Sequence, residues 1–186
     1  MEILYNIARV DLTELDPETG KPKSSGGVTT TIKTAKKAKL SAVIDEGSEE
    51  ILRTAEKILA VYRSDDLLYG YDLTFTDNTF DIKTAQLVAG YVKSTADGAG
   101  ENDLQTPMMS EGNQGKPFKM DIYVANMEGD SIKGYCQITL NKCTGKFPDM
   151  EVGEEFYAPE FEVKARENTK ASLPIKNIAW VDSLPS

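Results

Sequence analysis

The chain has 186 residues, of which 40% are apolar, 27% charged and 8% aromatic, a composition typical of one globular domain. Its 21 Lys and Arg against 30 Asp and Glu give a net charge of −9, which argues against general binding to a phosphate backbone. The sequence contains no histidine, which excludes His-based triads, His general bases and His-ligated zinc. We therefore expect no enzymatic activity, no cofactor and no metal.

The N-terminus has neither the basic region nor the apolar region of a signal peptide. No later segment approaches the roughly 18 consecutive apolar residues of a membrane span. We expect neither secretion by a signal peptide nor a membrane anchor.

Two segments without apolar periodicity are predicted to be long loops. Residues 13–34 and 94–116 are rich in Gly, Pro, Ser, Thr and Asp, and both exceed the length of an ordinary connection. Because strand-like sequence lies between and after them, we interpret residues 1–186 as one domain with two loop or arm insertions.

Residues 49–61 fit two interpretations. Their composition and the helical spacing of their apolar residues favour an α-helix; these residues are Ile51, Leu52, Ala55, Ile58 and Leu59. The alternative is two strands that break near Thr54, with residues 58–62 forming a strand buried on both faces.

Carboxylates are concentrated on both sides of this segment. They are Asp45, Glu46, Glu49 and Glu50 before it and Asp65 and Asp66 after it. Paired carboxylates can act as general acid and base when their surroundings separate their pKa values. No neighbouring residue type provides such a separation, so the pattern favours a solvated turn or an acidic surface lining.

A short helix is predicted at about residues 81–89. Asp81 is suited to cap its N-terminus, and Gly90 is suited to end it. The residues between them form one apolar stripe, namely Ile82, Ala85, Val88 and Ala89.

Two glycine-containing loops lack the spacing of ligand-binding motifs. Ser110 stands where a phosphate loop requires its first glycine, and Pro117 stands where a magnesium-binding hydroxyl is needed. Residues 97–103 lack the alternating ligands of a calcium loop. We predict neither kind of site.

The C-terminal half alternates with the period of half-buried strands. Residues 119–126 and 132–140 are predicted to form a hairpin through a turn at 127–130. The inward residues are Met120, Ile122, Val124, Ile132, Cys136, Ile138 and Leu140. Tyr157, Phe161, Val163 and Ala165 define a further strand, and residues 175–181, which include Trp180, define the last. Strands with one apolar face need a second layer, which predicts a β-sandwich or a barrel-like sheet.

The two cysteines are predicted to be reduced packing residues. Continuous strand between Cys136 and Cys143 would separate them by about 23 Å. A disulfide needs Cα atoms within about 7 Å of each other.

Residues 65–80 carry a resemblance to a known family. A strand containing Gly70-Tyr71-Asp72 is followed by an Asp77-Asn78-Thr79-Phe80 turn that leads into the short helix. This arrangement resembles the major tail tube proteins of tailed bacteriophages that infect Gram-positive bacteria. Residues 57–62 and 156–166 are also similar, so the likeness spans most of the chain.

The resemblance implies a mainly β, sandwich or barrel-like tail tube fold with one helix and a long hairpin contributing to an inner barrel. It also implies hexameric rings that stack into a hollow tube. On this basis we expect strands, not a helix, over most of residues 38–75. The two long loops become arms that bridge neighbouring subunits and successive rings.

The implied partners are other copies of the chain together with tape measure, tail terminator and baseplate or tail-tip proteins, and a sheath in a contractile tail. DNA would pass without specific binding, in a virion tail assembled in the host cytoplasm. An acidic chain suits a conduit, because cationic contacts to phosphate would retard DNA. The expected assembly or lumen residues are Asp45, Glu46, Glu49, Glu50, Asp65, Asp66 and Asp72.

Two alternatives remain open at the level of sequence. The chain could form the inner tube of a contractile tail or of a phage-tail-like bacteriocin. From a different class, it could be an isolated β-sandwich module that binds a carbohydrate or a protein. Such a module favours clustered exposed aromatics, whereas Trp180 is the single Trp and the eight Tyr are scattered.

Overall fold

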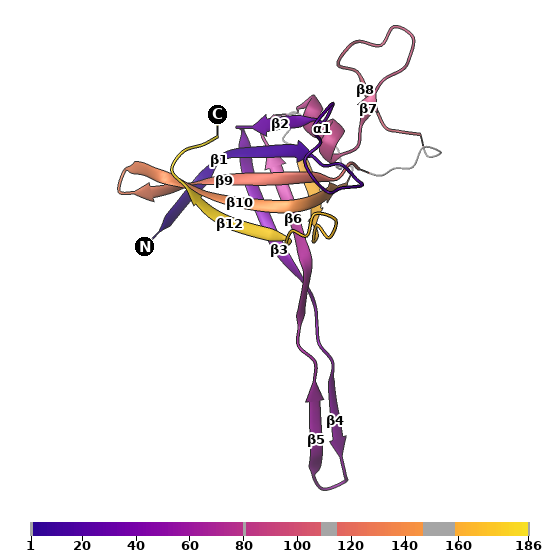
Figure 1. Ribbon diagram of the computed structural model, residues 1–186, viewed down its shortest axis with the longest axis vertical. Helices are drawn as coiled ribbons and strands as arrows, with labels where there is room; N and C mark the ends of the chain where they lie inside the picture. Colours follow the sequence, from indigo (N-terminus) through magenta and orange to yellow (C-terminus); the bar gives the residue numbers. More distant parts are fainter. Residues whose placement is uncertain (1, 80, 109–114, 147–158, 186) are drawn as a thin grey trace, which may run out of the picture.

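The structure, a computed structural model, describes residues 2–79, 81–108, 115–146 and 159–185. Within them the chain is mainly β, with antiparallel strands and one short helix (Figure 1). The larger strands are β1 (Ile3–Glu14), β3 (Ala35–Asp45), β6 (Leu67–Asp77), β9 (Phe118–Glu128) and β10 (Ser131–Gly145). The shorter ones are β2 (Thr29–Ile32), β4 (Glu49–Arg53), β5 (Ile58–Arg63), β7 (Val92–Lys93), β8 (Leu104–Gln105), β11 (Glu160–Ala165) and β12 (Lys176–Val181).

One large sheet folds over to make two layers. Its strand order is β2-β1-β9-β10-β11-β6-β3, and β12 also pairs with β10. β10 pairs with β12 over Tyr135–Leu140 and with β11 over Cys143–Gly145. Between these two parts of β10, from Leu140 to Cys143, its register with β9 shifts. This irregularity lets β10 belong to both layers, whose strands cross steeply in Figure 1.

The core lies between the layers and under the helix. Its largest fully buried side chains include Phe75, Phe118, Phe161, Leu12, Leu73, Leu87 and Met120. The rings of Phe75 and Phe161 stack with centroids 6.4 Å apart. The expected mainly β fold with two layers is therefore present.

The predicted helix is confirmed as α1 (Ile82–Val88). The carboxylate of Asp81 accepts a hydrogen bond from the backbone N–H of Thr84 at 2.8 Å, which caps the N-terminus. Gly90 has a φ of 75°, the left-handed conformation that commonly follows a helix end. Ala85, Val88 and Ala89 are buried as the stripe predicts, and Ile82 is half-buried.

The β9–β10 hairpin and the strands β11 and β12 are also confirmed, although Tyr157 lies outside the described residues. Ile132 is exposed near the hairpin turn instead of facing inward. Cys136 and Cys143 are free and buried on one continuous strand, and burial raises the pKa of both thiols. No helix among the described residues is long and apolar enough to cross a membrane.

The helix favoured by composition over residues 49–61 is wrong, and the strands expected from the resemblance are present. β4 and β5 pair with each other through a turn at Thr54–Lys57. They extend in the same direction as the β3–β6 pair. In that pair, β3 and β6 lie side by side as antiparallel strands. The prediction that residues 58–62 are buried on both faces is wrong for a single chain, because all of β5 is exposed.

The first long loop is shorter than predicted. β1 extends to Glu14 and β2 occupies Thr29–Ile32, so the loop is confined to residues 15–28. It packs on the body, where the side-chain amide of Asn168 donates to the carbonyl of Gly20 at 2.7 Å.

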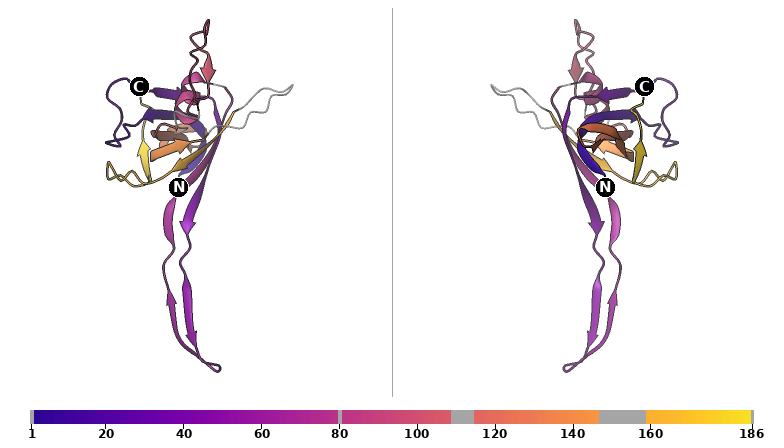
Figure 2. Two further views of the ribbon diagram at one scale, coloured as in Figure 1. Left: turned by 90° about the vertical axis from the view of Figure 1, so that its right-hand side faces the viewer. Right: turned by 90° about the vertical axis from the view of Figure 1, so that its left-hand side faces the viewer.

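The second long loop contains a small hairpin, because Lys93 of β7 pairs with Leu104 of β8. Its residues 109–114 lie outside the described part of the chain. The most prominent projection of the molecule is neither loop but the hairpin that contains β4 and β5 (Figure 2).

Candidate functional site

The hairpin formed by residues 44–69, here called the arm, projects away from the two-layered body (Figures 1 and 2). Its base is the outer end of the β3–β6 ladder, where Asp45 pairs with Leu67. Its distal part is the β4–β5 hairpin, which joins no larger sheet among the described residues.

A narrow waist, residues 46–48 and 64–66, joins the two parts of the arm. The backbone N–H of Ser64 donates to the carbonyl of Ser48 at 3.0 Å, and the N–H of Ser48 donates to the hydroxyl of Ser64 at 2.8 Å. The N–H of Gly47 donates to Asp66 Oδ1 at 3.0 Å. A Cβ at Gly47 would lie 1.9 Å from the carbonyl oxygen of Ser64, so this close approach requires glycine.

Six of the seven acidic residues predicted from the sequence lie in this waist or directly beside it. Asp45, Glu46, Glu49, Glu50, Asp65 and Asp66, here called the waist carboxylates, are all exposed. Across the two strands, the N–H of Gly47 bonds to Asp66, and Glu49 stands opposite Arg63. Asp72 lies apart from them on the body, where its carboxylate is 3.2 Å from Arg166.

Apolar side chains cover much of the arm, all of whose residues are described. Ten large ones are between 49% and 67% exposed: Ile44, Ile51, Leu52, Ile58, Leu59, Val61, Tyr62, Leu67, Leu68 and Tyr69. Ile51 pairs with Val61, and the adjacent Leu52 pairs with Ala60. Because successive strand residues point to opposite faces, both faces of the β4–β5 hairpin carry apolar groups.

This surface has the character of a protein–protein interface. An isolated two-stranded hairpin is marginally stable in water, and contiguous exposed apolar surface typically marks an interaction site. The sequence held a signal for it, since the unbroken apolar run Ile58–Tyr62 predicts burial on both faces. In the single chain that burial is missing, and a partner would have to provide it.

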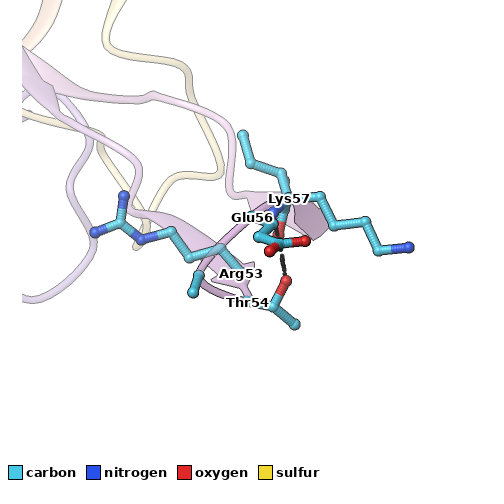
Figure 3. A pocket seen from close by; sticks show the side chains of 6 residues that line it. Arg53, Thr54, Glu56 and Lys57 are labelled. Carbon is cyan, nitrogen blue, oxygen red and sulfur yellow. Dashed lines mark hydrogen bonds between the residues drawn. The ribbon is translucent and has the colours of Figure 1, made fainter.

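The tip of the arm contains an open hollow of about 630 Å³ (Figure 3). One continuous turn, Arg53–Ile58, forms its entire lining. Thr54 and Lys57 hydrogen-bond to each other, while the side chains of Arg53 and Lys57 point away from each other in Figure 3. No polar groups converge on a common point, so the hollow is a feature of the turn and not a ligand site.

A second cavity, of about 330 Å³, lies in the body between the first loop and the sheet. Leu15, Pro22 and Leu173 contribute to its mainly apolar lining. The amide of Asn141 at its wall donates to the carbonyl of Pro174 at 2.8 Å, and Asn168 is likewise bonded to the backbone. These polar groups hold loops to the sheet, and their hydrogen bonds are used within the chain.

The exposed aromatic residues do not gather in one place. Tyr62 and Tyr69 lie on the arm, Tyr5 on β1 and Trp180 on β12. In the described part of the chain, no group of three or more Cys, Asp or Glu side chains is arranged to hold a metal ion.

Comparison with known proteins adds no assignment. No family model matches the chain, and no curated protein matches it in sequence.

Proposed function

We propose that this chain is the structural subunit of a phage tail tube, which polymerises as stacked hexameric rings into a hollow conduit for DNA. The observation that carries the proposal is the arm, which exposes ten large apolar side chains. Six of them lie on the β4–β5 hairpin, which pairs with no other strand of the described residues. The mainly β fold with one short helix agrees with what the sequence resemblance implies.

Self-association suits this surface for a physical reason. Burying apolar area is favourable, and a symmetric polymer provides every copy with the same partner surface. The partners in this proposal are other copies, tape measure, tail terminator and baseplate or tail-tip proteins, and a sheath where the tail contracts. DNA passes without specific binding, in a virion tail assembled in the host cytoplasm. The inner tube of a phage-tail-like bacteriocin would use the subunit in the same way.

Removing the arm tests the proposal. We expect replacement of residues 46–66 by Asn-Gly, which favours a tight hairpin turn between the paired Asp45 and Leu67, to leave the fold intact and to abolish assembly. Light scattering coupled to size-exclusion chromatography measures assembly, and circular dichroism verifies the fold. An armless variant that still polymerises like the parent would contradict the proposal.

A milder change keeps the arm and tests the contribution of its apolar side chains. Ile51→Thr with Val61→Thr keeps β-branched side chains but removes apolar area, so assembly should need a higher protein concentration. Ile132→Thr is the matched control, because Ile132 is similarly exposed but lies near the β9–β10 turn. The control should assemble like the wild type.

A further inference from the structure

Two groups of exposed charges with opposite sign lie at the two ends of β3. Lys33, Lys36, Lys37 and Lys39, here called the lysine segment, stand at its beginning and in the turn before it. The waist carboxylates lie at its other end. Among the ion pairs that the described residues form, none includes a member of either group.

The two groups are too far apart to neutralise each other within one molecule. The nearest members along β3, Lys39 and Asp45, are six positions apart, which at a strand rise of about 3.3 Å per residue is about 20 Å. Charges in solution are largely screened beyond about 8 Å at physiological salt. A second molecule can bring them together.

The lysine segment also lies at an open sheet edge. β3 is the last strand of its sheet, and no strand of the described chain pairs with its outer side. Lysines on an edge strand discourage unspecific pairing, because a partner must compensate their charge. A partner that brings carboxylates is favoured over one that does not.

We propose that the waist carboxylates of one copy bind the lysine segment of a second copy, so that copies associate head-to-tail. This inference rests on the proposed function, since cyclic rings are built from head-to-tail contacts, in which two different surfaces meet. Each copy is shifted along the arm direction relative to its neighbour, so that the apolar arm of one copy lies against the body of the next. The waist carboxylates thus serve assembly and not the channel surface.

Charge reversal tests the contact. One variant carries Lys36→Glu, Lys37→Glu and Lys39→Glu, and the other carries Glu46→Lys, Glu50→Lys and Asp65→Lys. Each variant alone should need at least about tenfold more protein to assemble, because like charges would meet. An equal mixture of the two, and a single variant with all six changes, should assemble again. Sedimentation measures assembly, and a variant with Lys133→Glu and Asp130→Lys near the β9–β10 turn is the matched control.

Cross-linking tests the geometry. A chain with both Lys37→Cys and Glu46→Cys should form a ladder of covalent oligomers on oxidation, whereas either substitution alone should not. The native Cys136 and Cys143 are buried and do not interfere. A two-fold contact between copies would instead stop at covalent dimers and would overturn the proposal.

The remaining outcomes separate this inference from the proposed function. Wild-type tubes together with charge-reversed variants that assemble equally well would overturn the inference and leave the proposed function standing. A variant with reversed waist charges that assembles normally but fails to deliver DNA would assign these carboxylates to the channel instead. A wild-type chain that stays monomeric would contradict both.

Discussion

Glu14 fixes the first loop to the end of β1. Its buried carboxylate accepts a hydrogen bond from the N–H of Val28 at 2.9 Å and lies 3.3 Å from Lys23 and 3.6 Å from Lys116. Burial by itself raises the pKa of Glu14, but the Val28 hydrogen bond and the two lysine charges outweigh it and lower the pKa below 4.5.

Replacing this carboxylate should change the response to acid. Because the folded pKa is lowered, ionised Glu14 adds stability that is present above pH 4.5 and is lost as the pH falls through the folded pKa. We expect Glu14→Gln to lower the free energy of unfolding by about 1–2 kcal/mol at neutral pH and by less at about pH 3. Urea unfolding at both pH values measures this. A constant difference between the two proteins would contradict the explanation.

Among the secondary-structure elements, the local alternation of apolar residues predicts those strands whose apolar face is buried within the same chain. In β9, β10 and β11, the alternation of apolar and polar residues reflects which side chains face the core, and the structure confirms these strands. β2 falls inside the loop predicted over residues 13–34, because Thr29–Thr31 lacks apolar alternation, although β-branched threonine itself favours strands.

The arm shows why the remaining elements were harder to predict. The apolar residues of 49–61 fit a helix by spacing, but the choice depends on the β3–β6 ladder, which continues into the arm. Likewise, the sequence alone places Asp45 near Glu50, whereas the hairpin register brings Asp66 to Gly47. Asp72 is near Asp65 and Asp66 in sequence, yet β6 has returned to the body by that residue.

The waist provides a prediction for the arm as an element. Gly47→Ala forces a Cβ against the backbone carbonyl of Ser64, so the two segments of the waist must separate. We expect weaker assembly with an unchanged melting temperature, since the waist contributes nothing to the buried core. Ser48→Ala is a milder control, because the backbone groups of Ser48 make its described hydrogen bonds. A lower melting temperature for Gly47→Ala would show that the waist supports the body.

The whole molecule combines a body with a complete core and an arm without one. Phe75, Phe118 and Phe161 fill the space between the layers, whereas no residue of β4 or β5 is buried. Folding and assembly should therefore be separable, with the body supplying the fold and the arm supplying contacts between copies.

Negative-stain electron microscopy of the purified 186-residue chain shows whether it forms tubes, rings or single particles. We expect hollow tubes of constant width built from stacked rings, which should become shorter or fewer as salt screens the charged contacts. The same images should show only small particles for the variant in which Asn-Gly replaces residues 46–66. Monomers at every protein concentration, with the arm intact and the fold verified by circular dichroism, would contradict the claim that this chain builds a tube.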